Sequence, residues 1–153
     1  MFRWAVPCIL AAALPASAAE PERPLTIEIT SGLEFSRLAM TGQDDGQAQI
    51  DARTGSRRVA GGLVGLGGMT VQGRGRITGT PLRSVRIDLP AQVGMTTPGG
   101  GRAELSGLAT DLPDFPMLDA SGVLEFSFGG KLRVQAGAGG TFRARIPISV
   151  DYN

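Results

Sequence analysis

Apolar and polar residues alternate with a period of two along most of this 153-residue chain. No stretch after residue 24 repeats apolar residues at the i, i+3, i+4, i+7 spacing of a helix. Such alternation is typical of strands that bury one face, and turn-forming residues separate the runs about every 8–12 residues. The pattern predicts an all-β fold, an Ig-like β-sandwich of roughly eight to ten short strands. The predicted strands cover residues 25–30, 33–35, 47–52, 57–64, 69–78, 84–89, 103–109, 123–128, 132–136 and 142–152.

One tight hairpin stands out among the predicted turns. Gly129-Gly130-Lys131 separates the alternating runs at 123–128 and 132–136. Two glycines in so short a connection are typical of a β-hairpin, because its turn residues take positive φ angles. We therefore expect these two runs to pair with each other.

The first 19 residues have the layout of a secretory signal peptide. A positive charge at Arg3 precedes an apolar run over residues 4–14, and small residues follow at 16–18. The run is too short to span a membrane, which needs about 20 residues. We expect cleavage after Ala18 or Ala19 and export to the periplasm, the cell surface or the medium.

Cleavage leaves a single predicted domain over residues 20–153. Residues 19–24, around the start of this domain, are polar and hold two prolines, which predicts a flexible leader. The one cysteine, Cys8, lies in the removed segment. The mature chain therefore has no disulfide, and its core alone must stabilise the fold.

Composition and charge exclude several classes of function. The chain has no histidine, which removes Ser-His-Asp and Cys-His catalysis and ordinary zinc sites. Lys and Arg total 15 against 14 Asp and Glu, so bulk electrostatics do not favour nucleic acid as a partner. We expect no catalytic residues, no cofactor and no enzyme activity.

Two segments resemble ligand sites but fit simpler interpretations better. The glycine-rich stretch 61–68 is followed by an alternating run, whereas a phosphate-binding loop needs a following helix. Asp111, Asp114 and Asp119 lie close together, but their spacing matches no calcium loop. We interpret the first as a turn or bulge and the second as a solvated loop, and we predict no metal site.

The last predicted strand carries the clearest alternation in the chain, and Pro147 favours an edge position because proline cannot donate to a central ladder. An exposed apolar edge strand invites pairing with another strand. This segment resembles the C-terminal motif of chaperone–usher pilus subunits. That resemblance implies binding by a periplasmic chaperone, followed by completion with a strand from a neighbouring subunit. The residues that carry it are Gly140, Phe142, Ile146, Ile148, Val150 and Tyr152.

More of the chain is similar to a secreted bacterial family called domain of unknown function 4402. Four stretches carry this resemblance, and together they span nearly all of the mature chain. The resemblance implies a fold and a compartment, since no activity is established for the family. The stretches are 33–35, 69–73 leading to 85–90, 124–132 and 150–153.

The sequence leaves two functions open. The first is a fimbria-like surface subunit that assembles with copies of itself by β-strand complementation. Leu25, Ile27 and Ile29 would supply the donated strand, which would fill a groove beside residues 142–152. The alternative is a monomeric periplasmic or cell-surface binding domain with no role in assembly, in which residues 25–30 form an ordinary first strand.

Overall fold

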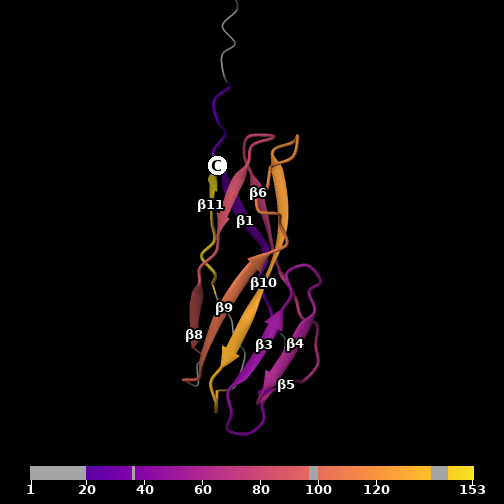
Figure 1. Ribbon diagram of the computed structural model, residues 1–153, viewed down its shortest axis with the longest axis vertical. Coiled ribbons are helices and arrows are strands. Elements are labelled where there is room, and N and C mark those ends of the chain that lie inside the picture. The colour runs from indigo at the N-terminus through magenta and orange to yellow at the C-terminus, as the bar shows by residue number, and fades with distance from the viewer. Residues whose placement is uncertain (1–19, 36, 97–99, 139–144) are drawn as a thin grey trace, which may run out of the picture.

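The computed structural model describes residues 20–35, 37–96, 100–138 and 145–153. All regular secondary structure in these residues is β-strand, which confirms the predicted all-β class (Figure 1). Within them, no helix is long and apolar enough to cross a membrane. The proposed signal peptide, together with Gly140 and Phe142, lies outside the described residues.

The described residues form eleven strands, one more than the upper end of the predicted range. The strands are β1 (Thr26–Ser31), β2 (Leu38–Met40), β3 (Gly46–Ile50), β4 (Arg57–Gly61), β5 (Leu63–Gly65), β6 (Gly73–Thr78), β7 (Val85–Asp88), β8 (Gln92–Thr96), β9 (Arg102–Thr110), β10 (Val123–Val134) and β11 (Ser149–Tyr152).

The long strand β10 organises the main seven-stranded sheet. Its first half pairs with β6 and its second half with β3, while β9 pairs along residues 128–134. Phe128 has register partners in both β6 and β9, so those two strands lie on opposite edges of β10. Beyond them, β1 extends the sheet from β6, β4 from β3 and β8 from β9. Two small sheets, β7–β11 and β2–β5, complete the fold, and all pairings are antiparallel.

The predicted hairpin at Gly129–Lys131 is wrong. Residues 123–134 form one continuous strand, in which Gly130 pairs with Ile50 of β3 and Gly129 with Ala109 of β9. The two glycines permit close approach of neighbouring chains: a Cβ on Gly129 would meet the backbone oxygen of Ile50. Glycine at these positions therefore reflects crowding, not a reversal of the chain.

Other differences concern strand boundaries. The predicted strand 57–64 divides at Gly61 into β4 and β5, because Gly61 takes a φ of 68° that breaks the extended conformation. Residues 33–35 contribute only an isolated bridge between Glu34 and Val71. The strands β2 and β8 were not predicted, since neither has a clear apolar alternation in the sequence.

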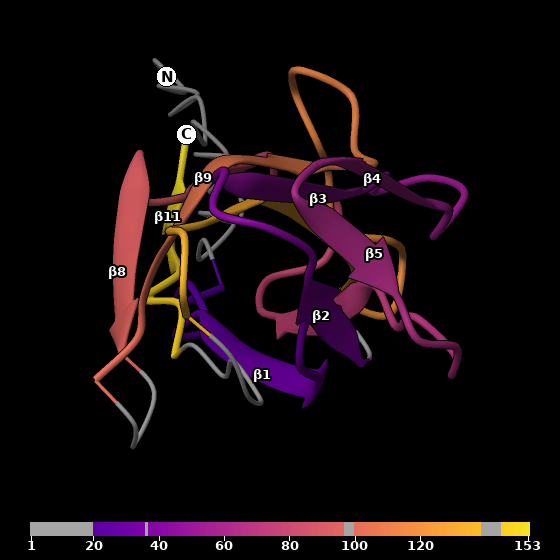
Figure 2. The same cartoon turned by 90° about the horizontal axis from the view of Figure 1, so that it is seen from below.

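The interior is filled by two clusters of buried side chains. Looking along the long axis, β9, β3 and β4 lie on one side of this interior and β1 on the opposite side, in a sandwich-like arrangement (Figure 2). Leu33 and Ile146 pack against both clusters and join them. The first cluster is Phe35, Ala48, Ile50, Leu63, Met95, Ala103, Leu105, Leu132, Val134 and Ala138. The second cluster is Ile77, Val85, Leu118, Phe126 and Phe128.

Candidate functional site

The segment predicted as a donated strand is β1, and in this chain it pairs within its own domain. β1 runs antiparallel to β6, with Ile27 opposite Ile77 and Glu28 opposite Arg76. Leu25 and Ile27 pack against the second core cluster because they face inward from this edge of the sheet. Ile29 is different: the register shifts between it and Ser31, and 43 % of Ile29 is exposed.

The C-terminal segment keeps the predicted alternation of side chains but only part of the predicted strand. Ile146, Ile148, Val150 and Tyr152 are all half-buried and pack against the second core cluster, whereas the residues between them are exposed. Only Ser149–Tyr152 forms a strand, β11, which pairs with β7. The shortening is a correction with a simple cause: Pro147 has no N–H to donate, and no described strand lies alongside residues 145–148.

β1 and β11 lie next to each other, and both pack side chains against the second core cluster. Their Cα atoms come within 8 Å of each other, although the two strands belong to different sheets. Within the described part of the chain, β1 pairs only with β6 and β11 only with β7. Each strand therefore presents one edge whose backbone groups are not part of a ladder.

An apolar groove lies between the C-terminal end of β1 and the residues that precede β11. Its volume is about 340 Å³. The groove and the exposed side of Ile29 lie at the same end of β1, so this end is the less firmly packed one. The lining residues are Ile29, Gly32, Leu33, Phe128, Arg145, Ile146 and Ile148.

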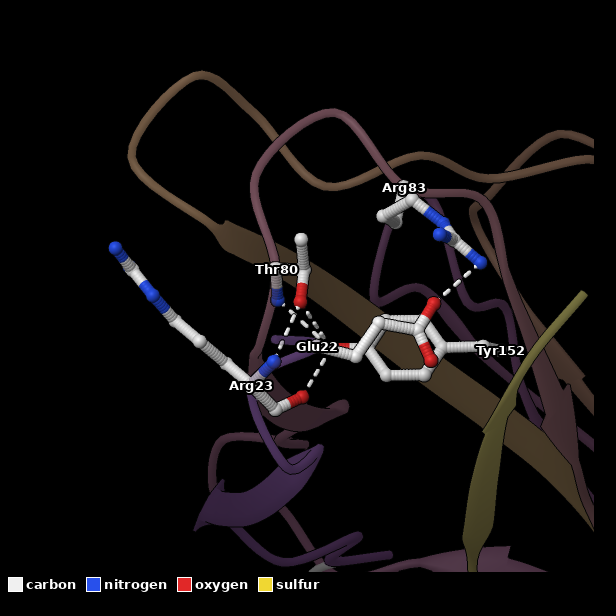
Figure 3. A network of polar contacts seen from close by, with 5 residues as sticks. All are labelled: Glu22, Arg23, Thr80, Arg83 and Tyr152. Atoms are coloured by element: carbon white, nitrogen blue, oxygen red, sulfur yellow. Dashed lines mark hydrogen bonds and ion pairs between the residues drawn. The ribbon is translucent and has the colours of Figure 1, made fainter. Parts of the chain in front are cut away.

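The opposite end of β1 is held by a network of polar contacts around Tyr152 (Figure 3). The Tyr152 hydroxyl donates to the carbonyl oxygen of Arg23 at 2.6 Å and accepts from the backbone N–H of Thr80 at 2.7 Å. The backbone N–H of Arg23 donates to Thr80 Oγ1 at 2.8 Å. The hydroxyl thus joins the leader, the β6–β7 connection and β11 at one point.

An ion pair and a cation–π contact extend this network, which we call the Tyr152 clasp: Glu22, Arg23, Thr80, Arg83 and Tyr152. Arg83 Nη2 lies 2.5 Å from Glu22 Oε1, and the Arg83 guanidinium carbon lies 5.4 Å from the centre of the Tyr152 ring. The side chains of Arg83 and Glu22 are 44 % and 49 % exposed, so the ion pair is a weak contributor. The sequence pattern predicted a flexible leader here. It did not identify as site residues the other members of the clasp, Glu22, Arg23, Thr80 and Arg83.

Comparison with known proteins identifies the family. The family model described as "Domain of unknown function (DUF4402)" matches residues 25–152. This span contains all eleven strands. The chain belongs to the DUF4402 family. No curated protein and no solved structure matches it. The resemblance of the last strand to chaperone–usher pilus subunits remains a prediction.

Two of the three aspartates that resembled a calcium loop, Asp111 and Asp119, have local structural roles in this DUF4402 domain. Asp111 accepts a hydrogen bond from the backbone N–H of Ser127 at 2.8 Å. Asp119 accepts from the backbone N–H groups of Ser121 and Val123, both at 2.9 Å, and from the Ser121 hydroxyl. Among the residues described, no group of three His, Cys, Asp or Glu side chains is placed to hold a metal ion.

The glycine-rich stretch 61–68 of the DUF4402 domain is built from strand and turn. Gly61 ends β4, residues 63–65 form β5, and Gly67 and Gly68 take φ angles of about 90°. No helix follows in the described chain, so the segment lacks the helix N-terminus on which phosphate loops depend. The interpretation as a turn or bulge holds for the glycines at 61, 67 and 68, whereas residues 63–65 form a strand.

We predict that Asp119 makes the stability of the domain depend on pH in the acidic range. The hydrogen bond from the Ser121 hydroxyl, followed by that from the Val123 N–H, lowers the pKa of Asp119 below its ordinary value. A carboxyl whose pKa is lower in the folded state stabilises the fold above its unfolded pKa, and this contribution is lost as pH falls through the folded pKa. Asp119→Ala should therefore lower the Tm at pH 7.

The acid dependence supplies the check on this prediction. The difference in Tm between wild type and Asp119→Ala should shrink as the pH falls below the ordinary pKa of an aspartate, about 3.9, and through the lower pKa of Asp119 in the folded domain. Asp114→Ala is the control, since Asp114 is an exposed carboxyl five residues earlier in the same loop. A constant difference from pH 7 to pH 3 would contradict the proposed role of the charge.

Proposed function

We propose that this DUF4402 domain is an exported structural subunit of the cell envelope that assembles with copies of itself by exchanging β1. The layout of residues 1–19 supports export. In the assembly, β1 of one copy pairs with β6 of the next copy and lies beside that copy's C-terminal segment. Strand exchange of this kind needs no new surface, because each copy gives and receives the same element.

The observation that carries this proposal is the position of β1. In the monomer, β1 already occupies the place beside the C-terminal strand that a donated strand would fill. Its register partners, Gly75 to Thr78 and Arg74, lie more than 40 residues further along the chain. A β1 from a second copy would meet the same partners, so the exchanged pairing would have the geometry of the internal one.

The connection after β1 suits such an exchange. Only Gly32 and Leu33 separate Ser31, the end of β1, from Glu34, which bridges to Val71 and exchanges two backbone hydrogen bonds with it. A connection this short favours domain swapping when it straightens, because the strand is then directed away from its own domain. A Cβ added to Gly32 would meet no atom within 4 Å, and glycine adopts more backbone conformations than any other residue.

Burial of β1 side chains would make the exchange consequential. Full burial of an aliphatic side chain is worth about 1.5–3 kcal/mol, so Leu25 and Ile27 together contribute at most about 3–6 kcal/mol. Both are half-buried, which places the actual value below that limit. Even half of it is a large share of the 5–15 kcal/mol by which a domain is typically stable.

A monomeric envelope domain that binds a partner is the second candidate. It is favoured by the same internal pairing of β1 with β6, because the isolated chain then supplies every strand of its own sheet. In that case the apolar groove and the loops would serve binding, and β1 would never leave its own domain. The two functions make opposite predictions about β1 pairing between copies.

A mixed-disulfide experiment tests the exchange. The mature chain lacks cysteine after removal of Cys8, so introduced thiols are the only ones present. Glu28 of β1 faces Arg76 of β6 in register. When Glu28→Cys and Arg76→Cys proteins are mixed under oxidising conditions, we expect a disulfide-linked dimer that joins one of each, because β1 of one copy pairs with β6 of the other.

A matched pair on strands that are not proposed to exchange provides the control. Gln49 of β3 and Lys131 of β10 are also exposed register partners, so mixing Gln49→Cys with Lys131→Cys should give no linked dimer above background. The double variant with cysteines at 28 and 76 should give a locked monomer that no longer associates. If the 28/76 mixture yields only unlinked monomers at high protein concentration, β1 does not exchange and the monomeric function is favoured.

A further inference from the structure

We infer that the Tyr152 clasp is the restraint that keeps β1 in its own domain, and that its release controls how fast β1 is exchanged. This inference rests on the proposed exchange for its biological consequence, but the restraint itself is a property of the monomer. The two ends of β1 are held unequally.

The end of β1 next to Gly32 is weakly held. The register with β6 shifts between Ile29 and Ser31, which interrupts the regular ladder there. Ile29 is 43 % exposed and lines the apolar groove, so it contributes little burial. This end of the strand therefore offers little resistance to opening.

The end of β1 next to the leader is held by several independent contacts. Leu25 and Ile27 pack against the second core cluster. Immediately before them, the backbone of Arg23 is bonded at both its carbonyl and its N–H, to the hydroxyl groups of Tyr152 and Thr80 respectively. Detachment of β1 from its own β6 must break these contacts, because the leader moves with the strand.

The hydroxyl bonds outweigh the ion pair within the clasp. Two half-exposed side chains such as Arg83 and Glu22 gain little from pairing in water. The Tyr152 hydroxyl is half-buried, makes two bonds shorter than 2.8 Å and connects three segments of the chain. Removal of this one oxygen should therefore weaken the clasp more than neutralising Glu22.

Hydrogen exchange of backbone amides in Tyr152→Phe tests the inference. The phenylalanine keeps the ring that packs in the core and loses only the hydroxyl. Loss of two hydrogen bonds should speed the exchange of β1 amides about 5- to 30-fold. Exchange in β10 serves as the internal reference for global stability, so the measured quantity is the β1 rate relative to the β10 rate.

Two further variants separate the clasp from a general weakening of this end of the domain. Ser84→Ala removes the acceptor of an Asn153 side-chain hydrogen bond and the donor of a long bond to the Pro116 carbonyl, both next to the β7–β11 pair and away from the leader, and should change the ratio less than twofold. Glu22→Gln should also have a small effect. An unchanged ratio in Tyr152→Phe, or an equal change in Ser84→Ala, would overturn the inference.

The mixed-disulfide assay distinguishes this inference from the proposed function. With the Tyr152→Phe substitution added, linked dimers of the 28/76 pair should form faster by a similar factor. If β1 amides exchange faster but no linked dimer forms, the clasp restrains β1 and the proposed assembly is wrong. If linked dimers form at the wild-type rate while β1 amides are unaffected, assembly stands and the clasp does not control it.

Discussion

Replacing Gly73 with alanine is expected to lower the free energy of unfolding by about 3 kcal/mol, at the upper end of the usual cost of overpacking a core. A Cβ on Gly73 would overlap the ring of Phe128, its register partner on β10. Phe128 is 1 % exposed, and although it also borders the apolar groove, its rigid ring overlaps the position of the added methyl group. Either the ring must leave its rotamer or β6 must separate from β10.

We expect the same overpacking at Gly75, two residues further along β6, since a Cβ there would lie 2.5 Å from the Phe126 ring. Denaturant unfolding of Gly73→Ala measures the loss. Gly94→Ala is the matched control, because Gly94 also lies in a strand but has nothing within 4 Å of an added Cβ. It should change stability by no more than about 0.5 kcal/mol.

A second-site substitution makes the cause specific. Phe128→Leu in the Gly73→Ala background should recover part of the lost stability, because the smaller side chain leaves room for the methyl group. In the wild-type background the same Phe128→Leu substitution should destabilise the domain, since it leaves a cavity. If the two substitutions are simply additive, the Gly73–Phe128 contact does not account for the cost.

These glycines also show which features of the fold could be predicted from the sequence and which could not. Alternation alone identified β6 as a strand, and it correctly placed Ile77 on the buried face. It did not reveal that Gly73 and Gly75 share that face, because a glycine has no side chain whose polarity would indicate burial. Their role depends on Phe126 and Phe128 from a strand about 50 residues away.

The candidate site was predictable to a similar extent. Leu25, Ile27 and the alternating residues Ile146 to Tyr152 were identified from period-two patterns that are local in the sequence. The clasp was not, because its bonds join residues 57, 72 and 129 positions apart. A polar leader with two prolines has no local pattern that indicates a fixed position.

The two possible conformations of Gly129 make opposite predictions for one substitution. In a tight hairpin, Gly129→Asn would create an Asn-Gly pair, which is the preferred sequence for such a turn, and stability would be kept or improved. In the continuous strand β10, the added Cβ meets the backbone oxygen of Ile50 and lies 2.8 Å from the backbone nitrogen of Ala52. Backbone atoms of a paired strand cannot move aside as a flexible side chain does.

We therefore expect Gly129→Asn and Gly129→Ala both to destabilise the domain by about 3 kcal/mol or more, since either disrupts the junction of β10 with β3. Lys131→Ala is the control on the same strand, since Lys131 is exposed and should change stability by about 0.5 kcal/mol or less. Urea unfolding of the three variants measures the differences. An Asn variant as stable as wild type would mean that the chain reverses at Gly129, and the pairing of β10 with both β3 and β9 would then be wrong.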